Sequence, residues 1–205
     1  MRLNPDDYDF ISNFSTVGAI VLGSLLATLG GLAATQLEWR FERQRRERQA
    51  ALFFGEVLST LLVILQIAKQ TKGRGDPYGP ITLRMLRQAL HEIGMYDRNR
   101  ETLYNLRNAE LRTRIHTRVL RISSPLNGIF DTTEEIRAGQ AQLRSPGLAA
   151  QEREEIEARV KRLSEMREAG FEFMEEAAQD IEVVIKDLEP VAAHSFADIA
   201  AAAQP

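Results

Sequence analysis

Apolar residues follow three patterns along the chain, and each pattern predicts a different kind of helix. Residues 14–37 form an uncharged, mostly apolar stretch, whereas residues 50–68 are apolar but interrupted by isolated polar side chains. Residues 81–93, 95–143 and 148–189 carry amphipathic stripes with apolar spacings of three and four, which are typical of helices. No convincing alternating strand pattern is present. We therefore expect an all-α protein, with one N-terminal transmembrane helix continuing into an antiparallel bundle of long amphipathic helices.

The stretch of residues 14–37 is long enough to cross a bilayer. Its 24 uncharged residues would form a helix of about 36 Å, and the hydrocarbon core of a bilayer is about 30 Å thick. Residues 1–13 before it contain three aspartates and only one arginine, whereas a secretory signal peptide begins with a basic segment. We therefore expect a retained transmembrane helix rather than a cleaved signal.

Charged residues on the two sides of this stretch predict its orientation. Basic residues near a membrane helix favour the cytoplasmic side, and here they follow residue 37. Residues 1–13 are therefore expected outside the cell membrane, as a short extracytoplasmic N-terminus, and residues 38–189 inside, as a cytoplasmic helical bundle. The residues just after residue 37 that predict this topology are also candidates for contact with lipid headgroups. A topology signal and headgroup contact explain these residues about equally well. They are Trp39, Arg40, Arg43, Arg45, Arg46 and Arg48.

Small residues recur every four positions within the predicted membrane helix, which indicates a ridge for helix association. Small side chains let two helix backbones approach closely and pack in lipid. Glycine and alanine are also common in membrane helices for other reasons, but an unbroken series favours self-association into a homo-oligomer. The ridge begins at Ser15, and its proposed association face is Ala19, Gly23, Ala27, Gly31 and Thr35.

Residues 50–68 allow two interpretations. Their length and apolar composition admit a second membrane crossing, but Glu56 and Gln66 interrupt them, and charged side chains are costly at the centre of a membrane. We favour a buried core helix that continues directly from the membrane helix, and a second membrane segment remains the alternative.

Glycine and proline predict where the later helices end. The segment 71–80 contains three glycines and two prolines and is expected to be a loop. Further expected boundaries are Gly94 as a helix end, Ser123-Ser124-Pro125 as a kink or break, residues 144–147 as a turn, and Pro190 as the end of the last helix. Residues 190–205 have little apolar bulk, so we expect a flexible C-terminal tail.

Charge is distributed unevenly behind the membrane helix. Residues 38–121 carry 17 basic and 9 acidic side chains, whereas residues 150–189 carry 6 basic and 13 acidic ones. The basic set could bind nucleic acid or the inner leaflet, but complementary charge already exists in the same bundle. We therefore expect pairing with the last helix, and no nucleic-acid partner. The set is Arg98, Arg100, Arg107, Arg112, Arg114, Arg118 and Arg121.

Candidate chemistry is sparse. The chain has no cysteine, and His91, His116 and His194 lack the spacing of a zinc protease or a di-iron bundle site. The serines lack the Gly-x-Ser-x-Gly elbow of a serine hydrolase. Glutamates of the last helix could bind a cation, but a charged outer face is their ordinary role. We expect no catalytic residues, no cofactor and no metal site.

These observations predict a non-enzymatic, membrane-anchored helical scaffold or interaction module of unknown pathway. It would contact membrane lipid through its anchor, self-associate through the ridge of small residues, and offer its bundle, with coiled-coil-like packing, to an unknown protein partner. The alternative is a regulatory or sensory subunit of a larger membrane complex, in which the continuous helix transmits motion. An enzyme built from unremarkable residues is a third interpretation.

Overall fold

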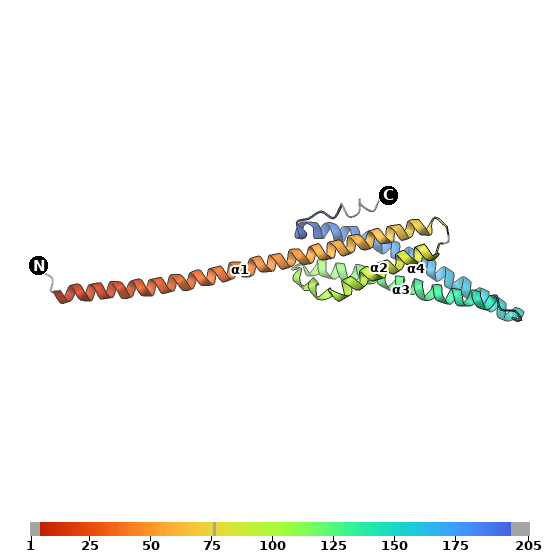
Figure 1. Ribbon diagram of the computed structural model, residues 1–205, viewed down its shortest axis with the longest axis horizontal. Coiled ribbons are helices and arrows are strands. Elements are labelled where there is room, and N and C mark those ends of the chain that lie inside the picture. Colours follow the sequence, from red (N-terminus) through yellow and green to blue (C-terminus); the bar gives the residue numbers. More distant parts are fainter. Residues whose placement is uncertain (1–4, 76, 198–205) are drawn as a thin grey trace. The chain divides into compact units, whose positions relative to one another are not determined.

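The computed structural model describes residues 5–75 and 77–197, and the surroundings of side chains for residues 18, 19, 21–75 and 77–197. The described part is all-helical and contains no strand, as the apolar spacing predicted (Figure 1). Its elements are α1 (Pro5–Lys72), α2 (Pro80–Arg98), the short 3-10 helix η1 (Arg100–Asn105), α3 (Ala109–Leu143) and α4 (Ala150–Ala192).

The chain divides into two compact units between Arg46 and Glu47. α1 contributes to both units, so the expected continuation of residues 14–37 into residues 50–68 within a single helix is confirmed. In the first unit, every described side chain from residue 21 to residue 46 is exposed.

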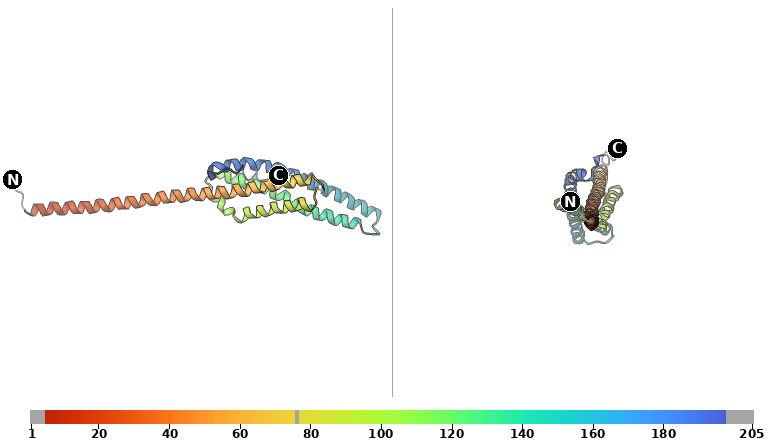
Figure 2. Two further views of the ribbon diagram at one scale, coloured as in Figure 1. Left: turned by 45° about the horizontal axis from the view of Figure 1, so that its top comes forward. Right: turned by 90° about the vertical axis from the view of Figure 1, so that its left-hand side faces the viewer.

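The second unit is built around one hydrophobic core that α1 shares with α2, α3 and α4. Figure 2 shows these helices of the second unit beside one another. The most apolar 18-residue window of α1 has a mean hydropathy of 2.0 and is 61% buried. Because residues 21–46 are exposed, this window belongs to the second unit. Glu56 and Gln66 lie on the exposed side of α1, so the core-helix interpretation of residues 50–68 is confirmed. The largest fully buried side chains include Phe54, Leu58, Leu61, Leu86, Tyr96, Ile115, Ile122 and Phe171.

A loop connects α1 to α2, as the glycines and prolines of residues 71–80 predicted. Gly79 precedes α2 in an extended conformation, and Pro80 begins the helix. Proline suits the first helical position because its fixed φ is helical and an N–H there would have no intrahelical partner.

The predicted end of the second helix at Gly94 is wrong, because α2 continues to Arg98. Glycine costs only about 1 kcal/mol in a helix interior. Two residues later, Tyr96 is buried and its ring contacts that of Phe54 edge-on at 5.9 Å between centroids. Burial of a large aromatic side chain outweighs the glycine cost, so the helix runs on.

The single helix predicted for residues 95–143 is divided instead, by η1 and a new helix start at Asn108. The side chain of Asn108 accepts a hydrogen bond from the backbone N–H of Leu111 at 3.1 Å, which caps α3. Pro125 does not break α3, which continues through it to Leu143. Ile122 and Leu126 on either side of Pro125 are fully buried, and their packing holds the helix together.

α3 and α4 pack along their lengths, joined by the predicted turn near Gly147, whose φ is 90°. Arg114 of α3 pairs with Asp187 of α4 at 2.5 Å. Arg118 and Arg121 both pair with Asp180, at 2.7 and 3.2 Å. Early residues of α3 thus lie opposite late residues of α4, and the expected charge complementarity with the last helix is confirmed for these three arginines.

The end of α4 differs from the prediction, because the helix passes through Pro190 and ends at Ala192. Leu188 and Ala192 are fully buried, and Arg48 Nε donates to the carbonyl oxygen of Ala192 at 2.9 Å, so the last turn is anchored on both sides. We call residues 193–197 the C-terminal hook; its Phe196 is only 2% exposed. The predicted flexibility of residues 198–205 lies outside the described residues.

Candidate functional site

The apolar segment of α1 in the first unit is exposed along its described length. Its seven large aliphatic side chains are each more than half exposed, with Leu22 and Leu26 at 63%. An isolated helix with apolar residues on all sides is typical of a membrane span. The seven are Val21, Leu22, Leu25, Leu26, Leu29, Leu32 and Leu37.

Hydroxyl groups in this segment are satisfied by the helix itself. The hydroxyl of Ser24 donates to the carbonyl oxygen of Val21 at 2.9 Å, and that of Thr28 donates to Ser24 at 2.8 Å. Thr35 donates in the same way to Gly31 at 2.9 Å. A polar group surrounded by hydrocarbon has no water to bond, so such local bonds are the form in which serine and threonine are tolerated in membrane helices.

The predicted association face is open along the described part of α1. Ala19, Gly23, Ala27, Gly31 and Thr35 are all exposed, and no atom beyond the helix itself lies within 4 Å of a Cβ built at Gly23 or Gly31. The side chain of Ser15, where the ridge begins, lies outside the described residues. Four residues turn an α-helix by about 400°, so each member of the series is rotated by about 40° from the last. The series is an inclined row, and its centre, from Gly23 to Gly31, is the part that one partner helix can cover.

The predicted topology residues fall into two groups. Trp39 and Phe41 are 73% and 68% exposed, and the arginines of the first unit are exposed beside them. Arg46 forms an ion pair with Glu42. Arg48 belongs to the second unit, where its guanidinium binds the end of α4. Arg40, Arg43, Arg45 and Arg46 therefore all lie exposed in the first unit, whereas Arg48 makes its contact in the second unit.

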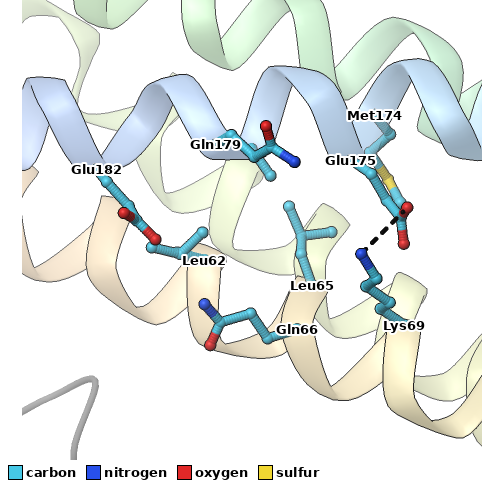
Figure 3. A pocket seen from close by; sticks show the side chains of 9 residues that line it. Leu62, Leu65, Gln66, Lys69, Met174, Glu175, Gln179 and Glu182 are labelled. Atoms are coloured by element: carbon cyan, nitrogen blue, oxygen red, sulfur yellow. Dashed lines mark ion pairs between the residues drawn. The ribbon is translucent and has the colours of Figure 1, made fainter.

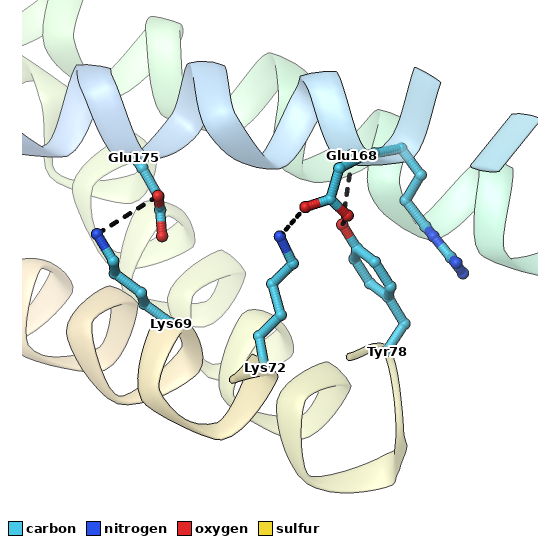
Figure 4. A network of polar contacts seen from close by, with 6 residues as sticks. Lys69, Lys72, Tyr78, Glu168 and Glu175 are labelled. Carbon is cyan, nitrogen blue, oxygen red and sulfur yellow. Dashed lines mark hydrogen bonds and ion pairs between the residues drawn. The ribbon is translucent and has the colours of Figure 1, made fainter. Parts of the chain in front are cut away.

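Glu168 of α4 is the centre of a polar network in the second unit that sequence patterns did not reveal (Figure 4). Its carboxylate pairs with Lys72 at the end of α1 and accepts a hydrogen bond from the hydroxyl of Tyr78 at 2.9 Å. Arg167 stacks on the ring of Tyr78 at 3.7 Å. Burial alone would raise the pKa of Glu168, but the hydrogen bonds and positive charges around it lower that pKa. The network fixes the loop between α1 and α2 against α4.

A second network joins α2, η1 and α3 around His116. The guanidinium of Arg100 donates to Nε2 of His116 at 3.3 Å, so the imidazole is neutral with its proton on Nδ1. Nδ1 then donates to the hydroxyl of Tyr96 at 2.8 Å. Burial and the charge of Arg100 lower the pKa of His116, partly opposed by Asp97. The sequence had indicated only that His116 lacks the spacing of a metal site, and the packing of α2 on α3 brings these side chains together.

A groove lies between α1 and α4 in the second unit (Figure 3). Leu62 and Leu65 of α1 form its apolar side, and Gln66, Gln179 and Glu182 stand along its rim. Lys69 and Glu175 close one end with an ion pair of 3.5 Å. Its walls lie more than a hundred residues apart in the sequence, so no local pattern could have predicted it.

Potential metal ligands are dispersed over residues 5–75 and 77–197, where no group of three His, Asp or Glu side chains could hold an ion. Comparison of the chain with protein-family models, curated proteins and solved structures gave no match.

Proposed function

We propose that this protein is a membrane-anchored helical interaction module. Residues 14–37 would cross the bilayer once, and the second unit would stand in the cytoplasm as an antiparallel bundle that binds a protein partner. The proposal includes no catalytic chemistry. Its basis is the contrast between two apolar stretches of α1, one covered by its own unit and one uncovered.

The uncovered stretch carries the proposal. Residues 50–68 are covered by α2, α3 and α4, whereas the apolar side chains of residues 21–37 remain exposed. Soluble proteins rarely expose a continuous apolar surface of this length. Lipid is the solvent in which such a surface is stable, and the internally bonded hydroxyls of Ser24, Thr28 and Thr35 fit that solvent.

The proposed orientation follows from the exposed arginines beside residue 37. Basic side chains are retained on the cytoplasmic side during insertion, and Trp39 with Phe41 would lie in the interface between lipid and water. The bundle is proposed as antiparallel because its connections are short and because α3 and α4 pair in opposite directions through their ion pairs.

Cysteine labelling tests insertion and topology cleanly, because the native chain has no cysteine. We would place single cysteines at Asn4, at Leu25 and at the exposed Ser145, and treat sealed vesicles of known sidedness with a membrane-impermeant maleimide. Asn4→Cys should react only in right-side-out vesicles and Ser145→Cys only in inverted ones. Leu25→Cys should stay unlabelled in both until detergent is added.

The possible failures are distinct from one another. Extraction of the intact chain from membranes by alkaline carbonate would refute the span. Loss of the N-terminal residues from the mature protein, measured by intact mass, would identify residues 14–37 as part of a cleaved signal. Reversed labelling of Asn4→Cys and Ser145→Cys would keep the anchor but place the bundle outside.

We further propose that the anchor self-associates through the centre of its inclined row of small residues, Gly23 to Gly31. Gly30 and Gly31 provide a matched pair, since a built Cβ at either has no atom within 4 Å beyond its own helix backbone, and only Gly31 is in the row. Gly31→Leu should weaken dimerisation in detergent at least tenfold, and Gly30→Leu should change it little. Association can be measured by energy transfer between labelled chains; equal effects of the two substitutions would refute the proposed face.

A further inference from the structure

The last part of α3 and the first part of α4 extend beyond the core of the second unit. The buried core residues of α3 end at Ile129, and those of α4 begin at Phe171. We call residues 131–169 the arm; they contain the remainder of both helices and the turn near Gly147. Figure 1 shows the arm projecting past the end of α1, and Figure 2 shows the same from a second direction.

The arm is packed as a unit of its own. Ile136 is only 4% exposed. A Cβ built at Gly139 of α3 would lie 2.7 Å from Cγ2 of Val160 of α4, so the two helices approach each other closely there. Glu135 and Arg159 form an ion pair across the arm at 2.6 Å. Because closely packed helices resist deformation, the arm can move as one body.

Both helices carry residues that weaken a helix at the root of the arm. Gly128 of α3 and Gly170 of α4 lie inside helices, where glycine loses more conformational freedom on folding than alanine does. Space requires neither glycine. No atom beyond its own helix backbone lies within 4 Å of a Cβ built at Gly128, and a Cβ built at Gly170 would make ordinary contact with Ile129 at 3.7 Å. Pro125, three residues before Gly128, also removes one backbone hydrogen bond from α3.

Two side chains from the end of α1 and the loop after it reach across this root. Nζ of Lys72 lies 4.2 Å from the ring centre of Phe171 in the core, and it pairs with Glu168 on the arm (Figure 4). The ring of Tyr78 contacts that of Phe171 edge-on at 6.2 Å between centroids, and its hydroxyl donates to Oε2 of Glu168 at 2.9 Å. Lys72 and Tyr78 each therefore hold one contact on the core and one on the arm.

We propose that the arm is hinged at Gly128 and Gly170, and that Lys72 and Tyr78 form a releasable clasp that holds the arm through Glu168. The side chain of Glu168 is 45% exposed, so water and salt reach its ion pair with Lys72. Exposed ion pairs contribute little net stability, and the clasp is therefore easy to open. With the clasp open, the two glycines let the arm swing while its own packing stays intact.

The consequence is a mechanical link between the arm and α1. Lys72 is in the last turn of α1, so an arm that swings away must release the end of that helix. A protein partner that binds the arm and draws Glu168 into its own interface would change both together. This inference concerns the second unit alone and depends neither on membrane insertion nor on self-association of the anchor.

Pulsed electron–electron resonance between two spin labels tests the hinge in the full-length chain, which has no native cysteine. The labels are placed at Ser145→Cys in the arm and at Gln88→Cys on the exposed side of α2. An excess of unlabelled protein in detergent restricts the measurement to distances within one chain. Glu168→Ala should at least double the width of the distance distribution. The matched control Glu165→Ala, at an exposed position three residues earlier in α4, should leave the width unchanged.

Two further measurements separate the clasp from the hinge. Raising the salt concentration should widen the distribution of the wild-type chain, because salt screens the pair of Lys72 with Glu168, and it should have no further effect on Glu168→Ala. Adding Gly128→Ala and Gly170→Ala to Glu168→Ala should narrow the distribution again, because alanine stiffens both helices at the root.

Two results would overturn the proposal. Equal widths for Glu168→Ala and Glu165→Ala would show that Glu168 does not hold the arm. A wide distribution that persists after both glycines are replaced would show that the motion does not arise at the root. Circular dichroism of each variant verifies that the helices are intact, which the half-exposed position of Glu168 favours.

Discussion

The ring of Phe196 occupies the space that a side chain at Gly55 would need. A Cβ built on Gly55 would lie 2.0 Å from Cζ of Phe196, far inside van der Waals contact. The two residues are separated by most of the second unit's sequence. Their contact joins the first buried turns of α1 to the C-terminal hook, which follows α4 in the chain. This contact explains why a glycine stands within the most apolar helix of the core.

Gly55→Ala should destabilise the second unit by about 1–3 kcal/mol, because the added methyl group forces the Phe196 ring to move. Gly128→Ala is the matched control: Gly128 also lies inside a helix, but no atom beyond its own helix backbone lies within 4 Å of its built Cβ. There, alanine should stabilise by about 0.5–1 kcal/mol through its higher helix propensity. Chemical denaturation followed by circular dichroism measures both, and stabilisation by both substitutions would contradict the close contact.

Ala193 is the one non-glycine residue with positive φ, 48°, in the described part of the chain. Left-handed backbone costs roughly 1–2 kcal/mol for an ordinary L-residue but not for glycine. Ala193→Gly should therefore stabilise by about 0.5–1 kcal/mol after the extra entropy of the unfolded chain is included. Ala158→Gly on the exposed side of α4 should destabilise by about 1 kcal/mol. Melting temperatures shifting in the same direction for both would refute the conformation at Ala193.

His116 should make the protein less stable in mild acid. Its pKa is lowered in the folded state, from an ordinary value of 6.5, by burial and by Arg100. The neutral imidazole is thus favoured by folding, and this contribution is complete above pH 6.5 and is lost as the pH falls through the lowered folded pKa. The size of this contribution is the difference between wild type and His116→Asn in the free energy of unfolding that is lost on acidification. The side-chain amide of the variant can still donate a hydrogen bond to Tyr96.

The test compares denaturation of the two proteins at pH 7.5 and at pH 5. The wild type should lose more stability over this interval than His116→Asn does, and an NMR titration should place the His116 pKa below 6.5. His91→Asn, at an exposed position of α2, serves as the control for the loss of a histidine. A raised His116 pKa, or an unchanged pH dependence in His116→Asn, would contradict the network.

Asp180 should matter more than the other carboxylates paired across α3 and α4, because it serves Arg118 and Arg121 together. Asp180→Asn should cost about 0.5–1 kcal/mol, a small value because the pairs are partly exposed to water. Glu135→Gln removes the pair with Arg159, whose side chains are both about half exposed or more, and should cost close to nothing. Raising the salt concentration should narrow the difference in the free energy of unfolding between Asp180→Asn and Glu135→Gln. An equal loss of stability in both variants would contradict this ranking.

Local spacing determined most of the secondary structure. The apolar stripes predicted the helices, and the glycines and prolines of residues 71–80 and 144–147 predicted the turns, because both depend on short-range backbone preferences. The helix ends expected at Gly94 and Pro190, and the break that was one of two expectations at Pro125, are absent for one shared reason. Glycine costs about 1 kcal/mol and proline about 3 kcal/mol or more inside a helix, and each of these positions has buried side chains nearby whose packing compensates for it.

The sequence by itself also determined that two apolar stretches lie in α1, but only the tertiary structure separated them. Both stretches have the composition of a membrane helix, and burial depends on which distant residues are available to cover each one. Residues 50–68 are covered by α2, α3 and α4, and residues 21–37 have no such cover in the described chain. The groove, the His116 network and the contact of Phe196 with Gly55 likewise join residues far apart in sequence. No local pattern encodes them, because only the packing of the helices decides which side chains meet.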